Sequence, residues 1–127
     1  MGENAQLSNK TFGLADLTNS IFNSLSVSQT TDTLGIGQLE QRECLILIDG
    51  LGQDGLDRYG EEFEIFSQLK QVKNLSANFP STTATSLSTL GTGVLPGVHG
   101  MLGYTVRVPR SDNRLLNALK WDERVDP

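Results

Sequence analysis

Apolar and polar positions follow two different spacings along the chain, and these spacings predict helices and strands in alternation. The helical spacing of apolar residues between positions 14 and 25 predicts an amphipathic helix. The unbroken apolar run Cys44–Ile48 is typical of a strand that is buried on both faces of a parallel sheet, and Asp49 and Gly50 close it. Between these elements, residues 26–41 are rich in Ser, Thr, Gly and Gln and predict a loop.

The second half of the chain continues the alternation. The expected helices are a short one that Asp54 caps and that ends at Tyr59, and one that is marked by Phe63, Phe66 and Leu69. The expected strands are Val72–Phe79 and Tyr104–Val108, the latter followed by a turn over 109–113. The last apolar cluster comprises Leu115, Leu116, Leu119 and Trp121. We expect Cys44, Phe63 and Trp121 to be core residues.

A helix with hydroxyl groups crowded at its start is predicted after Pro80. Residues 81–83, Ser-Thr-Thr, are good N-cap types, and such a helix start offers free N–H groups that suit a phosphate. The apolar stripe of this helix is expected to comprise Ala84, Leu87, Leu90 and Val94. Gly91 and Gly93 are expected to end the helix, and Pro96 to prevent its resumption.

The order of these elements predicts an α/β fold with right-handed crossovers and a parallel sheet. Reactive groups in such sheets gather at the C-terminal ends of the strands. Asp49 and the hydroxyl run after Phe79 both occupy such ends, about one βαβ unit apart, so we expect them to be neighbours in space.

Composition narrows the class of protein. The chain has 127 residues, of which 37% are hydrophobic and 20% charged, as expected of one globular domain. Its net charge of −5 argues against general nucleic-acid binding. No signal peptide and no apolar run of membrane-spanning length is visible, so we predict a cytoplasmic protein without a membrane partner. Residues 1–13 are expected to form a polar tail, and residues 14–127 the folded portion.

Three candidate site features each have a structural and a functional interpretation. Asp49 either caps the next turn or ligates a metal, because a carboxylate at the end of a buried strand needs a partner. The hydroxyls after Pro80 either cap a helix or include a nucleophile that a metal or base activates. His99, the single histidine, is either a metal ligand or a residue that orders a turn by hydrogen bonding, and we favour the turn.

A competing motif lies directly after the first predicted strand. Residues 50–55, Gly-Leu-Gly-Gln-Asp-Gly, match the GxGxxG pattern of a dinucleotide-binding domain. Asp49 and Asp54 oppose this interpretation, since they put negative charge beside a pyrophosphate. The next strand also ends without the acidic residue that holds the ribose.

Taken together, Leu45–Gly50, the pattern Phe-Pro-x-x-Thr ending at Thr83, and Thr-Gly-x-x-Pro-x-x-His-Gly over 92–100 resemble the type I phosphodiesterase/nucleotide pyrophosphatase family. This family belongs to the alkaline phosphatase superfamily. The resemblance implies a three-layer α/β fold with a mostly parallel sheet and a site for two divalent metals, usually zinc. It implies that Asp49 is a metal ligand and that Thr83 is both a metal ligand and the nucleophile that attacks a small-molecule phosphate ester. Thr82 and Thr85 stay open as alternatives to Thr83.

Three departures from the family pattern shape the prediction. Residues 84–88, Ala-Thr-Ser-Leu-Ser, replace the Phe-Pro-Asn-His-Tyr of better-known members. Tyr104 stands where those members have a phosphoryl-binding Asn, so we expect it to contact the substrate. The family's remaining Asp and His ligands lie far downstream and have no counterpart here.

We therefore expect the N-terminal part of a bacterial-branch enzyme, inactive by itself and only marginally stable. A non-catalytic α/β module, or a truncated product, is the alternative. Sulfatase relatives require Cys or Ser at the nucleophile, which Thr83 is not.

Overall fold

The computed structural model describes residues 11–38, 42–69 and 74–120, so the predicted tail before residue 11 and Trp121 lie outside the described residues. The chain enters through β1 (Phe12–Gly13) and continues directly into α1 (Leu14–Ser24). The backbone N–H of Gly13 donates a hydrogen bond of 2.9 Å to Asp16 Oδ2, which satisfies one free donor at the start of α1. The helix predicted over 14–25 is thus present as far as Ser24, but its buried residues are the polar Thr18, Ser20 and Ser24.

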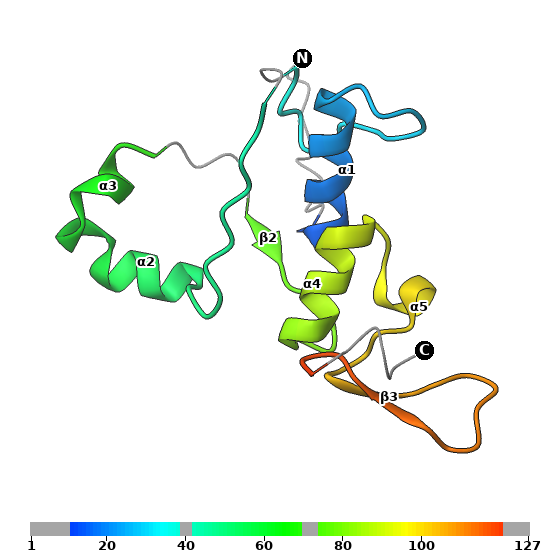
Figure 1. Cartoon of the computed structure of the whole chain (residues 1–127). Coiled ribbons are helices and arrows are strands. Elements are labelled where there is room, and N and C mark those ends of the chain that lie inside the picture. Colours follow the sequence, from blue (N-terminus) through cyan, green and yellow to red (C-terminus); the bar gives the residue numbers. More distant parts are fainter. Residues whose placement is uncertain (1–10, 39–41, 70–73, 121–127) are drawn as a thin grey trace, which may run out of the picture.

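Helix α1 packs against α4 (Thr83–Thr92), and this helix pair is the centre of the molecule (Figure 1). Two side chains of α1 bond to the last turn of α4: Thr18 Oγ1 donates to the Leu90 carbonyl at 2.9 Å, and Asn19 Nδ2 to the Gly93 carbonyl at 2.7 Å. Gly93 follows α4 with a φ of +69°, a left-handed conformation that glycine adopts without strain. Polar contacts therefore fix the closed end of α4 against α1.

The side of α4 that is buried differs from the predicted apolar stripe. Ala84, Thr85 and Thr89 are buried, whereas Leu87 remains 47% exposed and Val94 36% exposed. The prediction from spacing was right for Ala84 but wrong for Leu87 and Val94. Thr85 and Thr89 are buried because the hydroxyls of this face find hydrogen-bond partners, which removes the cost of burying them.

Proline 96 starts a helix instead of preventing one. Helix α5 (Pro96–His99) has Pro96 in its first turn, where the missing N–H is no loss and the fixed φ is suitable. A glycine in the left-handed conformation follows each of the two helices. Gly93 follows α4 with a φ of +69°, and Gly100 follows α5 with a φ of +73°.

The strands are short and form two separate ladders. In the first, β1 pairs in parallel with β2 (Leu75–Ser76), with Phe12 opposite Leu75. In the second, β3 (Thr105–Arg107) and β4 (Leu115–Asn117) are antiparallel. The strand expected in Tyr104–Val108 and the turn after it are confirmed. Of the strand expected over Val72–Phe79, the structure describes residues 74–79, and within them only β2 is a strand. The described residues thus form a mixed α/β structure with two small sheets.

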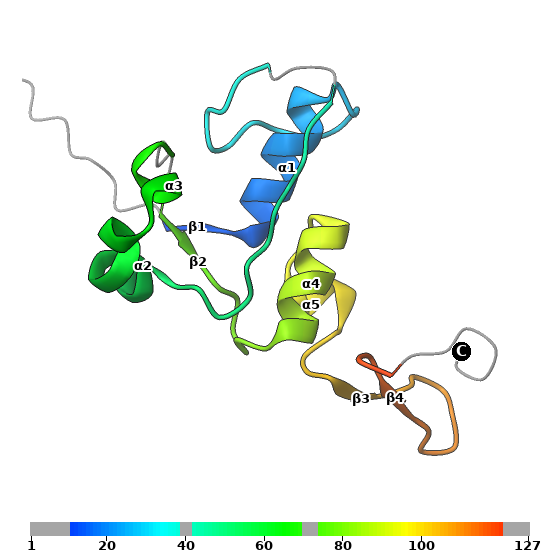
Figure 2. The same ribbon diagram turned by 60° about the vertical axis from the view of Figure 1, so that its left-hand side comes forward.

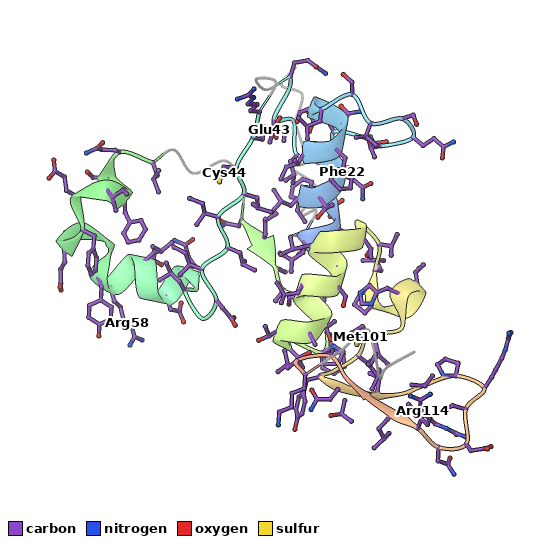
Figure 3. All side chains as sticks on the ribbon, viewed as in Figure 1. Phe22, Glu43, Cys44, Arg58, Met101 and Arg114 are labelled. Atoms are coloured by element: carbon purple, nitrogen blue, oxygen red, sulfur yellow. The ribbon has the colours of Figure 1, made fainter. Side chains whose placement is uncertain are left out.

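The prediction that failed most clearly concerns the apolar run 44–48. It is extended but forms no strand, and Ile46 is 77% exposed and Leu45 53% exposed. Cys44, expected in the core, is also exposed and lies on the segment that leads from α1 toward α2 (Figure 3). Within the described residues no strand pairs with this run, and a strand becomes buried on both faces only when neighbours cover both.

A small helical lobe follows Asp49 and stands apart from the α1–α4 pair (Figures 1 and 2). It comprises α2 (Gln53–Tyr59), η1 (Gly60–Glu62) and α3 (Glu64–Ser67). Both predicted helices are present, but Gly52 occupies the N-cap of α2, and Asp54 lies in its first turn. Phe63 was predicted to be a core residue and is 53% exposed, packing edge-on against Phe66 with ring centroids 5.9 Å apart.

Candidate active site

The structure brings Asp49 and Thr83 into direct contact, although they lie on different segments. Thr83 Oγ1 donates a hydrogen bond of 3.1 Å to Asp49 Oδ2, and both residues are solvent-exposed. Asp49 lies in the turn that follows the run 44–48, where Gly50 has a φ of +76° and turns the chain toward α2. Thr83 is the first residue of α4. The prediction that the carboxylate and the hydroxyl run would be neighbours is confirmed.

The hydroxyls of Thr82 and Thr85 are engaged with each other at the start of α4. Thr82 is the N-cap, and its Oγ1 accepts a hydrogen bond of 3.2 Å from the Thr85 N–H. The hydroxyls of Thr82 and Thr85 are also 2.8 Å apart. Since Thr85 is fully buried, Thr83 is the member of these three threonines that presents its hydroxyl to solvent beside a carboxylate.

His99 orders a turn, as predicted. Its Nδ1 accepts a hydrogen bond of 3.0 Å from the backbone N–H of Met101, which follows α5 (Figure 3). Its Nε2 lies 3.0 Å from Thr89 Oγ1. With a partner at each ring nitrogen, His99 offers no free lone pair to a metal in this arrangement.

Two residues that bond near His99, Asn78 and Thr89, were not predicted from the sequence. Asn78 Nδ2 donates a hydrogen bond of 2.6 Å to Thr89 Oγ1, and Thr89 Oγ1 donates one of 3.0 Å to the Thr85 carbonyl. The spacing of Thr85 and Thr89, four residues apart, could have shown that they share one face of the helix. Nothing in the sequence marks Asn78, because its partner is brought to it only by the turn before α4.

Tyr104 lies immediately before β3 with 57% of its surface exposed. Its carbonyl accepts a hydrogen bond of 2.7 Å from the Ala118 N–H, which extends the β3–β4 ladder. Its predicted contact with substrate stays a prediction.

The described residues supply only part of a metal site. Asp49 and Thr83 present two oxygen ligands of the kind that divalent cations accept. Among residues 11–38, 42–69 and 74–120, however, no group of three or more His, Cys, Asp or Glu side chains is placed to hold a metal ion. A protein metal site needs about four ligands, so this part of the chain does not complete one.

A mostly apolar pocket of about 310 Å³ lies within the helical lobe. Its lining comprises Leu51, Gly55, Leu56, Tyr59, Gly60, Glu62, Phe63 and Phe66. The same region contains the GxGxxG pattern, but the segment before Gly50 forms no strand, so the strand–turn–helix setting of a dinucleotide site is not present here.

Comparison with known proteins identifies the family. Residues 44–124, more than half of the chain, match the type I phosphodiesterase/nucleotide pyrophosphatase family, and the chain belongs to it. The match includes both Asp49 and Thr83. No curated protein and no solved structure matches the chain. In the part of the chain that the structure describes, no helix has the length and apolar character needed to cross a membrane.

Proposed function

We propose that this chain supplies the nucleophile and the first metal ligand of a hydrolase that cleaves phosphate diesters or nucleotide pyrophosphates. The family gives the reaction class, a hydrolase of the phosphodiester type. The hydrogen bond of 3.1 Å between Thr83 Oγ1 and Asp49 Oδ2 is the observation that carries the proposal, because it puts a solvent-accessible hydroxyl beside a group that can accept its proton.

In the proposed reaction, Thr83 Oγ attacks phosphorus and the P–O bond to one ester group breaks. The Thr83 proton leaves along its hydrogen bond toward Asp49 and ends on the departing alcohol, which leaves neutral. Water then attacks the phosphorus of the threonyl ester, the bond between Oγ and phosphorus breaks, and Thr83 regains a proton. The products are one alcohol and one phosphate monoester.

We further propose that Asp49 and Thr83 each ligate a divalent metal, with zinc the expected ion and two ions in the complete site. When bound, such an ion stabilises the alkoxide form of the hydroxyl and neutralises phosphoryl charge. The remaining ligands would come from outside the described residues. We propose that this chain is the N-terminal part of a longer catalytic domain. Tyr104 is proposed to contact the phosphoryl oxygens, and the cytoplasm is the proposed location.

One observation favours a second candidate, a non-catalytic module. Among the described residues, Asp49 and Thr83 are the two candidate metal ligands that lie together, and no group of three or more His, Cys, Asp or Glu side chains completes a site there. Under this alternative, the Asp49–Thr83 bond only joins the turn at 49–50 to the start of α4.

The test is phosphodiesterase activity of the gene product that contains this chain, with zinc supplied and bis(4-nitrophenyl) phosphate as substrate. We expect Thr83→Ala to abolish release of 4-nitrophenolate and to prevent covalent labelling of the α4 peptide in quenched reactions. Ser81→Ala is the matched control, since Ser81 is an exposed hydroxyl two residues away whose Oγ donates only to the Asn78 carbonyl. Unchanged activity in Thr83→Ala would remove Thr83 from the nucleophile's role. A wild-type protein inactive on every diester tested would favour the module.

A further inference from the structure

A fully buried hydroxyl joins three segments of the chain beside the candidate site. Thr89 is 0% exposed, and its Oγ1 contacts Asn78 Nδ2 at 2.6 Å, the Thr85 carbonyl at 3.0 Å and His99 Nε2 at 3.0 Å. Asn78 precedes the turn into α4, and His99 ends α5. The three segments that meet at Thr89 are thus the entry to α4, α4 itself and the segment after it.

The hydrogen-bond directions at this hydroxyl follow from donor and acceptor chemistry. The Met101 N–H donates to His99 Nδ1 at 3.0 Å, so Nδ1 carries no proton and the proton of a neutral ring lies on Nε2. Nε2–H therefore donates to Thr89 Oγ1. The Thr89 hydroxyl then donates once, to the Thr85 carbonyl, and accepts twice, from Asn78 and His99, which uses its full hydrogen-bonding capacity.

The network lies on a different side of α4 from Thr83. With 3.6 residues per turn, Thr85 is rotated about 200° and Thr89 about 240° from Thr83 around the helix axis. The buried Thr85–Thr89 face therefore decides which way Thr83 points. Thr18 and Asn19 of α1 hold the far end of α4 through the Leu90 and Gly93 carbonyls. The contacts of Thr89 with Asn78 and His99 add a second constraint on the rotation of the same helix.

We propose that His99 is a positioning residue for Thr83: by donating to Thr89, it sets the rotation of α4 that directs the Thr83 hydroxyl toward Asp49. The catalytic part of this inference rests on the proposed function. The role assigned to His99 goes beyond ordering its own turn, because it depends on Nε2 and not on the contact between Nδ1 and Met101.

A pair of substitutions separates these two contacts. In His99→Gln the side-chain amide NH₂ takes the place of Nε2–H and can donate to Thr89. In His99→Asn the amide oxygen takes the place of Nδ1 and can accept from the Met101 N–H, but Thr89 is out of reach. We expect His99→Gln to keep kcat near that of the wild type. We expect His99→Asn to lower kcat about ten- to hundredfold with little change in KM, because the Thr83 hydroxyl would be displaced from its reacting position. Thr89→Val should reproduce the loss, and the His99→Asn/Thr89→Val double variant should be no worse than either single variant.

Amide hydrogen exchange in the 127-residue chain tests the positioning without any activity. The Ser86 N–H, bonded to the Thr82 carbonyl at 2.9 Å, reports on the first turn of α4. It should exchange about tenfold faster in His99→Asn than in the wild type and at the wild-type rate in His99→Gln. The reverse order, or equal behaviour of the two variants, overturns the inference. An inactive wild-type enzyme would remove the proposed function, whereas the exchange rates would still decide the role of His99.

Discussion

At the scale of single residues, the molecule uses backbone N–H groups to hold its carboxylates. Asp32 is the clearest case: Oδ1 accepts from the N–H groups of Gly35 and Ile36 at 2.8 and 3.1 Å, and Oδ2 from that of Gly37 at 2.8 Å. The pKa of Asp32 is lowered, most of all by the hydrogen bond from Gly37 and further by those from Ile36 and Gly35. Together these bonds outweigh desolvation, which raises the pKa. The charged form of Asp32 therefore organises the loop after α1.

This pKa shift predicts how stability depends on pH. Because the folded-state pKa of Asp32 lies below its unfolded value, the carboxylate stabilises the fold at pH values above about 3.9. That contribution is lost as the pH falls through the folded-state pKa. Urea midpoints measured over the acid range should fall more steeply for the wild type than for Asp32→Asn, whose amide nitrogen cannot accept from a backbone N–H. Asp112→Asn, in the exposed β3–β4 turn, is the control, and equal slopes for wild type and Asp32→Asn would contradict the prediction.

At the scale of elements, the closed end of α4 depends on one glycine. A Cβ at Gly93 would lie 3.3 Å from Asn19 Nδ2 and 3.4 Å from Thr18 Cγ2, in addition to requiring the left-handed φ of +69°. The two side chains that such a Cβ would crowd are the ones that bond α1 to α4. Gly93 thus serves both the end of the helix and the close approach of α1.

We expect Gly93→Ala to lower the free energy of unfolding by about 1–2 kcal/mol, the cost of a left-handed conformation for a residue with a Cβ, with crowding against Asn19 in addition. Gly91 is the matched control: it lies inside α4 and a Cβ there meets nothing within 4 Å. Gly91→Ala should raise the free energy of unfolding by about 0.5–1 kcal/mol through helix propensity. Urea denaturation followed by circular dichroism measures both, and a destabilised Gly91→Ala or an unaffected Gly93→Ala would count against this account.

At the scale of the whole molecule, the sequence predicted local helices and the order of elements, but it did not predict which residues are buried by distant segments. The helix predicted over 14–25 and the proximity of Asp49 to Thr83 followed from spacing and element order, and the hydrogen bond of 3.1 Å bears out the latter. The burial of the run 44–48 was predicted wrongly. Its apolar composition indicates that burial is favourable, but it does not indicate which segments would cover the run. The contacts of Asn78, Thr89 and His99 were invisible for the same reason: each depends on a partner that only the folded chain brings near.

The exposed run 44–48 predicts that separate copies of this chain associate. Leu45, Ile46, Leu47 and Ile48 are each more than half exposed, at 53%, 77%, 51% and 54%, and an extended apolar segment without a strand partner is a site for edge pairing between molecules. Ile46→Lys should lower the weight-average mass measured by light scattering at high protein concentration. Its free energy of unfolding should be nearly unchanged, because the side chain is already in solvent.

Val98→Lys provides the control for this last comparison, since Val98 is 75% exposed but lies on the short helix α5, where no extended backbone is available for pairing. It should leave the association unchanged. If both variants reduce association equally, added charge and not the strand-forming run is responsible. If Ile46→Lys unfolds the chain, the run is covered in solution, and the exposure that motivates the prediction does not hold.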